Sequence, residues 1–196
     1  MSPSIDAAPT LVPNIYDPTA PNAQNVCPGY TASNVANIKQ GFTADLNLAG
    51  PACNVYGNDI SALYLTVEYQ AKERLSVKIV PRYIVPKNYT QYILPSNLTP
   101  LPAGDGMTTA DSSDLAFKWS NTPSFQFEVS RRVDGEVLFS TYGKKIIFED
   151  QFLELATSMT PNYNVYGLAE NIHDFRLGNN YTQTFYAADS GNPVDR

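Results

Sequence analysis

Residues 125–139 read Phe-Gln-Phe-Glu-Val-Ser-Arg-Arg-Val-Asp-Gly-Glu-Val-Leu-Phe. Apolar residues alternate with polar ones at the start of this stretch, and a second apolar run follows Asp134-Gly135. A period of two is typical of a β-strand with one buried face. Asp-Gly between two such runs indicates a hairpin, because both residues tolerate positive φ. The stretch therefore predicts two antiparallel strands joined at Asp134-Gly135.

The same alternation continues on both sides of this hairpin. Apolar residues recur at every second position in 42–48, 63–69, 75–79 and 115–119, and shorter apolar runs lie at 146–148, 152–155 and 163–166. About ten short strands at such spacing predict an all-β fold, an antiparallel β-sandwich. We find no convincing helix. Residues 100–114 are typical of a surface loop, and we expect Trp119, which alternates with Leu115 and Phe117, to lie in the core.

Length and charge exclude several classes of protein. A chain of 196 residues suits one domain with a sizeable core. Its net charge of −6 argues against a nucleic-acid binder, which needs a basic face, and against a polybasic membrane surface. No apolar run approaches the roughly 20 residues that span a membrane. Aromatic residues make up 12% of the chain. Disordered chains contain few aromatic residues, so this content argues against disorder throughout.

The amino end differs in composition from the rest of the chain. Residues 1–26 contain five prolines, at positions 3, 9, 13, 18 and 21, which favour extended backbone. We therefore divide the chain into a Pro-rich extended arm at 1–26 and a β-sandwich domain at 27–196. Residues 1–26 show neither the basic end nor the apolar stretch of a signal peptide, so we expect a mature or engineered start.

Two cysteines and three glycan acceptor triplets bear on the compartment. Asn88, Asn97 and Asn180 each begin an Asn-x-Ser/Thr triplet without proline in the middle. In a cytosolic protein Cys27 and Cys53 would be two buried thiols. The three triplets and the even cysteine count favour an oxidising compartment instead, with secretion, N-glycosylation and a Cys27–Cys53 disulfide.

A search for catalytic chemistry finds little in this chain. His173 is the single histidine, and no nucleophile elbow, zinc motif or phosphate-binding loop accompanies it, so we expect no metal or cofactor and interpret His173 as solvated. Glu149, Asp150 and Glu154 cluster, and paired carboxylates hydrolyse glycosides. We interpret these acids as solvent-facing positions or a turn, because they alternate with Phe and Leu. The sequence predicts a sandwich without a self-contained active site.

Several segments nevertheless resemble a known family. Residues 123–139 are similar to the N-terminal domain of glycoside hydrolase family 31, as are the segments Phe-Glu-Asp-Gln-Phe-Leu-Glu-Leu at 148–155 and Asn-Tyr-Asn-Val-Tyr-Gly-Leu-Ala-Glu at 162–170. Ala169 departs from the usual Tyr-Gly-Leu-Gly-Glu. Segments 27–30, 41–44, 53–57 and 65–70 look like secreted fungal α-glucosidases. The resemblance covers about residues 26–196.

The resemblance implies a retaining enzyme that releases terminal, non-reducing α-linked glucose, and the fungal likeness favours α-1,4 links of the maltose type. The family's two catalytic aspartates lie on a (β/α)₈ barrel that begins after this sandwich, so none is expected here. Residues 184–189, Thr-Phe-Tyr-Ala-Ala-Asp, resemble the family's substrate loop, at about 179–196. Asp189 matches an aspartate that binds sugar hydroxyls, and Tyr186 is a weaker candidate for an aromatic wall. Without the resemblance, Asp189 is a turn residue and Tyr186 a packing residue.

Three functions follow from these observations. In the first, the chain is a fragment or subunit of an α-glucosidase, and a larger partner chain carries the barrel. In the second, it is a stand-alone carbohydrate-binding sandwich. In the third, it is a purely structural lid. The chain ends at Arg196, a basic residue within the expected substrate loop, and this end favours a protease-nicked enzyme. Transglucosylation stays open.

Overall fold

The computed structural model describes residues 19, 21–84, 102–159, 163–167 and 175–177. The chain divides into two compact units, one formed by Pro21–Ser158 and the other by Met1–Ala20 with Met159–Arg196. The larger unit contains all the named strands. Within the described ranges no helix is long and apolar enough to cross a membrane.

Four consecutive strands form an antiparallel sheet in the order β1-β2-β3-β4. They are β1 (Tyr30–Ile38), β2 (Gly41–Leu48), β3 (Ala62–Ala71) and β4 (Arg74–Pro81), and a 3-10 turn, η1 (Arg82–Ile84), follows. The register places Leu46 opposite Leu63, and Leu65 opposite Ile79. Because side chains alternate along each strand, these residues all face the same side of the sheet.

A second antiparallel sheet has the order β5-β6-β7, and a two-stranded ribbon follows it. The strands are β5 (Leu115–Ser120), β6 (Gln126–Arg131), β7 (Val137–Ser140), β8 (Ile147–Phe148) and β9 (Leu153–Glu154). The predicted hairpin is confirmed: β6 pairs with β7, and Gly135 adopts φ +76° in the turn between them. Residues 102–114 form the predicted loop.

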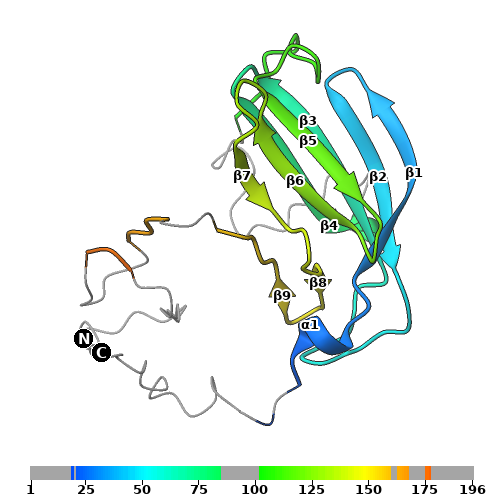
Figure 1. The fold of residues 1–196 in the computed structure, drawn as a ribbon. Helices are drawn as coiled ribbons and strands as arrows, with labels where there is room; N and C mark the ends of the chain where they lie inside the picture. Colours follow the sequence, from blue (N-terminus) through cyan, green and yellow to red (C-terminus); the bar gives the residue numbers. More distant parts are fainter. Residues whose placement is uncertain (1–18, 20, 85–101, 160–162, 168–174, 178–196) are drawn as a thin grey trace, which may run out of the picture. The chain divides into compact units, whose positions relative to one another are not determined.

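The inner faces of the two larger sheets pack against each other and form the core (Figure 1). Buried apolar residues from both sheets make one cluster, namely Tyr30, Ala32, Ala44, Leu46, Leu63, Leu65, Val67, Phe125, Phe127 and Ile146. Trp119 packs against it, as predicted, with its ring 6.4 Å from that of Phe42 across the two sheets. The all-β sandwich is therefore confirmed.

Three local features differ from the sequence predictions. β1 was not expected, because only Tyr30 and Ala32 of its residues are buried and a bulge interrupts its pairing after Ser33. The strand predicted at 163–166 is wrong, since these residues have no strand structure. A single helical turn, α1 (Ala23–Val26), lies in the segment where prolines favour extended backbone; its first turn is capped by the Asn22 side chain, which accepts from the Gln24 amide.

Two described segments of the smaller unit contact each other. The Leu177 amide donates to the Val165 carbonyl at 2.9 Å. The rings of Tyr166 and Phe175 lie 4.8 Å apart. Segments 163–167 and 175–177 therefore lie side by side within this unit. The division into an arm at 1–26 and a sandwich at 27–196 stays a prediction.

Leu65→Ala tests the core. Leu65 is 0% exposed, so the truncation leaves a cavity and should lower the free energy of unfolding by about 2–5 kcal/mol. Val133→Ala is the control, because Val133 is 87% exposed and should change stability by less than about 0.5 kcal/mol. Urea unfolding followed by Trp119 fluorescence measures both. Equal urea midpoints for the two variants would contradict the assigned core.

Candidate functional site

The predicted site residues divide into two groups. Asp189, Tyr186, His173 and the glycan acceptors Asn88, Asn97 and Asn180 lie outside the described residues, so their roles stay predictions. Cys27, Cys53 and the acids at 149, 150 and 154 are described, and contacts link them where α1, the β2–β3 loop and the β8–β9 ribbon meet (Figure 1). We call this place the disulfide junction.

The structure joins Cys27 to Cys53, with a Cα–Cα distance of 4.9 Å. Cys27 ends α1 and is 2% exposed, while Cys53 belongs to the loop between β2 and β3. Lys145 fixes the first cysteine by donating from Nζ to the Cys27 carbonyl at 2.6 Å. The bridge joins residues with a sequence separation of 26. By lowering the entropy of the unfolded chain, a loop of this length stabilises the folded state by about 3.5 kcal/mol. It ties the start of β1 to the loop that leads into β3.

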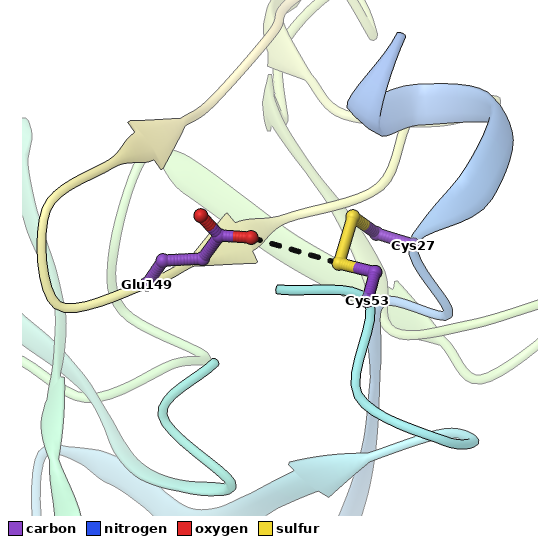
Figure 2. A group of neighbouring side chains, drawn as sticks. All are labelled: Cys27, Cys53 and Glu149. Atoms are coloured by element: carbon purple, nitrogen blue, oxygen red, sulfur yellow. Dashed lines mark hydrogen bonds between the residues drawn. A yellow bond between two sulfur atoms is a disulfide. The ribbon is translucent and has the colours of Figure 1, made fainter. Parts of the chain in front are cut away.

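Glu149 is buried, which corrects the prediction that it faces solvent or a turn. It is 3% exposed, and its two carboxylate oxygens accept from the Val55 amide at 2.9 Å and the Tyr56 amide at 2.8 Å. Figure 2 shows one of these oxygens directed at the disulfide, 3.7 Å from Cys53 Sγ. A disulfide sulfur carries no hydrogen, so this is a contact only. The carboxylate is buried because inward-pointing amides of the β2–β3 loop need an acceptor there.

A second carboxylate, Asp59, organises the same loop from its other end. Its Oδ2 accepts from the amides of Cys53 and Asn54. Asn54 returns a bond from its side chain, since its Oδ1 accepts from the Asp59 amide at 2.9 Å. Asn54 has φ +47°, a conformation that asparagine tolerates better than most residues. Asp59 also forms an isolated bridge with Glu149, so the loop is fixed along both edges.

Tyr30 closes the junction from the core side. Its hydroxyl donates to the Ile60 carbonyl at 2.8 Å and also lies 3.1 Å from the Phe148 carbonyl. Burial raises the pKa of Tyr30 far above its ordinary value, and the negative charges of Asp59 and Glu149 raise it further. The phenol therefore serves as a neutral donor between the segment that leads into β3 and strand β8.

The other two acids of the cluster also make structural hydrogen bonds. Asp150 accepts from the amide and the side chain of Asn58, and these bonds lower the pKa of the Asp150 carboxyl. Glu154 Oε1 accepts from Gln24 Nε2 at 2.9 Å, which links β9 to α1. Each acid thus binds a different partner.

The junction has the chemistry of a structural clamp. Glycoside hydrolysis needs two carboxyls that face the sugar from opposite sides, whereas Glu149 is buried and bonded to two backbone amides. Both cysteine sulfurs and a Glu149 oxygen lie within 4.8 Å of one another, as metal ligands would. The sulfurs are joined to each other, however, and a metal needs them as thiolates. Sequence reasoning missed this clamp because no local pattern pairs position 149 with position 55.

Glu149→Gln tests the clamp. A glutamine amide group replaces one acceptor oxygen with a donor that faces a backbone N–H, so the free energy of unfolding should fall by about 2–3 kcal/mol. Glu136→Gln is the control: Glu136 is exposed and its carboxylate pairs with the exposed Arg131, and the loss of this pair should cost less than about 1 kcal/mol. Urea unfolding gives both values, and intact mass under non-reducing conditions checks the disulfide. Similar losses in both variants would contradict the clamp.

Tyr30 makes stability depend on pH. The raised pKa means that folded Tyr30 keeps its proton where a tyrosine of the unfolded chain has lost it. Stability should therefore fall as the pH rises above about 10, because the unfolded chain then binds fewer protons. The decline should be shallower in Tyr30→Phe than in the wild type or in the surface control Tyr83→Phe. Unfolding curves taken across this pH range measure it, and identical slopes in all three proteins would refute it.

Comparison with known proteins finds relatives of this chain. No model of a known protein family matches the chain. It is 50% identical over 192 residues to an alpha-glucosidase of Aspergillus oryzae, and 46% identical over 193 residues to an alpha-glucosidase of Aspergillus niger. Each alignment covers 98% of this chain. A glucoamylase 1 of Schwanniomyces occidentalis is 40% identical over 187 residues, or 94% of the chain.

The chain is much shorter than these relatives. It spans 20% of the length of both Aspergillus proteins and 19% of the Schwanniomyces protein. Identity of this level along nearly the whole chain leaves no long segment unmatched, so the match applies to the sandwich and to the residues after it. The chain is a homologue of the fungal alpha-glucosidases of glycoside hydrolase family 31 and corresponds to an N-terminal region of them.

Proposed function

We propose that this chain is the N-terminal part of a retaining, exo-acting α-glucosidase that hydrolyses terminal, non-reducing α-1,4-linked glucose in maltose and maltooligosaccharides. One observation carries the proposal: the chain is 50% identical, over 98% of its length, to a protein named alpha-glucosidase. The proposed substrate and stereochemistry extend the family resemblance to this chain.

In this proposal the chain contributes a scaffold and a substrate loop, and the rest of the enzyme contributes the catalytic aspartates. The relatives have about four-fifths of their length outside the matched region, because the chain spans 20% of them. The acids of the disulfide junction support this division, since Glu149 and Asp150 each bind backbone amides of the β2–β3 loop. The larger part, which carries the barrel, is the partner chain.

Asp189 is proposed to bind the sugar from the loop at about 179–196. An ionised carboxylate accepts from two adjacent hydroxyls, and such charge-assisted bonds are about twice as strong as neutral ones. Tyr186 is the weaker candidate, as an aromatic wall beside the same sugar. Neither residue takes part in bond cleavage in this proposal.

The enzyme is proposed to be secreted and N-glycosylated at Asn88, Asn97 and Asn180. The Cys27–Cys53 disulfide supports an oxidising compartment, because structural disulfides persist there and are rare in the cytosol. Treatment with a peptide N-glycosidase, followed by mass spectrometry, would locate occupied acceptors.

Asp189→Ala tests the substrate contact. The enzyme assembled from this chain and the larger chain should release glucose from maltose, and the variant should show a KM for maltose at least about tenfold higher, from the loss of a charge-assisted bond. Asp111→Ala is the control, because Asp111 is exposed in the 102–114 loop. Both variants should unfold at the wild-type temperature.

The other outcomes select the alternatives. Unchanged kinetics in Asp189→Ala would leave the chain a purely structural scaffold. A chain that stays alone on a sizing column and shows no glucosidase activity, but binds maltooligosaccharides, would be a stand-alone carbohydrate-binding sandwich. Glucose release by this chain alone would contradict the proposal that the catalytic aspartates lie in the larger part.

A further inference from the structure

One sulfur of the disulfide lies between two carboxylates. Asp59 Oδ1 is 3.5 Å from Cys53 Sγ, and Glu149 Oε1 is 3.7 Å from the same atom. Figure 2 shows the Glu149 oxygen directed at this sulfur. Because a disulfide sulfur has no hydrogen to donate, neither carboxylate gains a hydrogen bond from it. The two contacts therefore place negative charge beside Cys53.

Other charged and titratable groups at the junction agree with this distribution of charge. Burial is the main cause of the raised pKa of Tyr30, and the charges of Asp59 and Glu149 raise that pKa further. On the other side of the bridge, Lys145 donates from Nζ to the Cys27 carbonyl at 2.6 Å. The two cysteines thus differ in their surroundings, with two carboxylates at Cys53 and an ammonium group at the backbone of Cys27.

Thiol–disulfide exchange begins when a thiolate attacks one sulfur of the disulfide. The attacking sulfur bonds to that sulfur, the original S–S bond breaks, and the other cysteine leaves with the electron pair as a thiolate. A second external thiolate then attacks the mixed disulfide and completes the two-electron reduction. The reaction of a buried disulfide therefore depends on which sulfur is reached and on where the negative charge arises.

Both directions of attack are unfavourable at this junction. Attack at the half-buried Cys53 brings a negative sulfur toward two carboxylates and leaves a thiolate on Cys27, which is 2% exposed. Burial disfavours such a charged leaving group. Attack at Cys27 requires access to the buried sulfur and leaves a thiolate on Cys53, beside both carboxylates. Of the two sulfurs, Cys53 is the one that an external thiol reaches more easily.

We propose that Asp59 and Glu149 form an electrostatic shield that protects the Cys27–Cys53 disulfide from small thiols, which attack as anions. The shield gives the two carboxylates a second role beside that of binding the amides of the β2–β3 loop. The groups that hold the loop in shape thereby also preserve the covalent bridge at its start. The proposal does not depend on the proposed function, because its contacts all lie within Pro21–Ser158.

Thiols of different charge test the shield in the full wild-type chain. The reactive thiolates of cysteamine, β-mercaptoethanol and mercaptoethanesulfonate are neutral overall, singly negative and doubly negative. Each initial rate of mixed-disulfide formation, per thiolate, is divided by the rate with bis(hydroxyethyl) disulfide, which removes differences in nucleophilicity. At about 0.1 M salt, where charges act over about 10 Å, the neutral species should react at least about fivefold faster than the doubly negative one. Equal normalised rates would overturn the proposal.

Asp59→Asn removes one of the two charges and keeps the hydrogen bonds of the loop. The amides of Cys53 and Asn54 donate to Asp59 Oδ2, whereas Oδ1 contacts Cys53 Sγ, so an amide nitrogen can take the place of Oδ1. Exchange with β-mercaptoethanol should accelerate at least about fivefold, the effect of one unit charge about 4 Å away even in water. The rate difference between the neutral and the doubly negative thiol should shrink.

Asp111→Asn is the matched control. Asp111 is exposed in the 102–114 loop, so this variant loses the same net charge far from the disulfide in sequence and should react like the wild type. Thermal unfolding before the addition of thiol shows that each variant is folded. An unchanged rate in folded Asp59→Asn would overturn the proposal. Equal acceleration with all three thiols would also overturn it, because that result indicates an opened loop and not a lost charge.

The position of the mixed disulfide gives an independent measurement in the wild-type chain. Acid quenching at early times, alkylation of the released thiol and mass spectrometry of peptides show which cysteine carries the external thiol. We expect the external thiol on Cys53 and the alkyl group on Cys27. The reverse assignment would overturn the proposal. This result and the wild-type series with three thiols decide the proposal even where Asp59→Asn does not fold.

Discussion

The buried Glu149 carboxylate connects three parts of the chain that are far apart in sequence. It directly follows β8, accepts from the amides of Val55 and Tyr56, and contacts the disulfide that begins at Cys27. The loop between β2 and β3 keeps its shape because both oxygens of this carboxylate are occupied by backbone donors. The β8–β9 ribbon is thereby attached to the loop that joins two strands of the four-stranded sheet. Without this carboxylate, two inward-pointing amides would be buried without an acceptor, which costs more than an ordinary hydrogen bond contributes.

Much of the fold follows from local sequence patterns, and the parts that do not have identifiable causes. Strands with strict alternation, such as β3 with Leu63, Leu65 and Val67, are evident from sequence because one face is buried throughout. β1 was missed because its second half is exposed and carries no apolar pattern. The disulfide junction was even harder to predict from the sequence. The burial of Glu149 depends on amides almost a hundred residues earlier in the chain, and a single sequence contains no signal for such a pairing.

The sandwich with its clamp and the proposed substrate loop are two separate features of the chain. The sandwich and its clamp come from contacts within Pro21–Ser158, whereas the substrate loop with Asp189 comes from family resemblance. In the proposed function the clamp affects activity only indirectly, because its residues hold the β2–β3 loop and the β8–β9 ribbon in place.

In the proposed function this region supports the catalytic part of an α-glucosidase and touches substrate only through its carboxyl-terminal loop. A crystal structure of the intact enzyme with a bound glucose mimic tests this claim most directly. We expect the carboxyls that flank the anomeric carbon to come from outside residues 1–196, and Asp189 to accept from the sugar hydroxyls. A carboxylate of the sandwich unit, such as Asp150, at the anomeric carbon would contradict it.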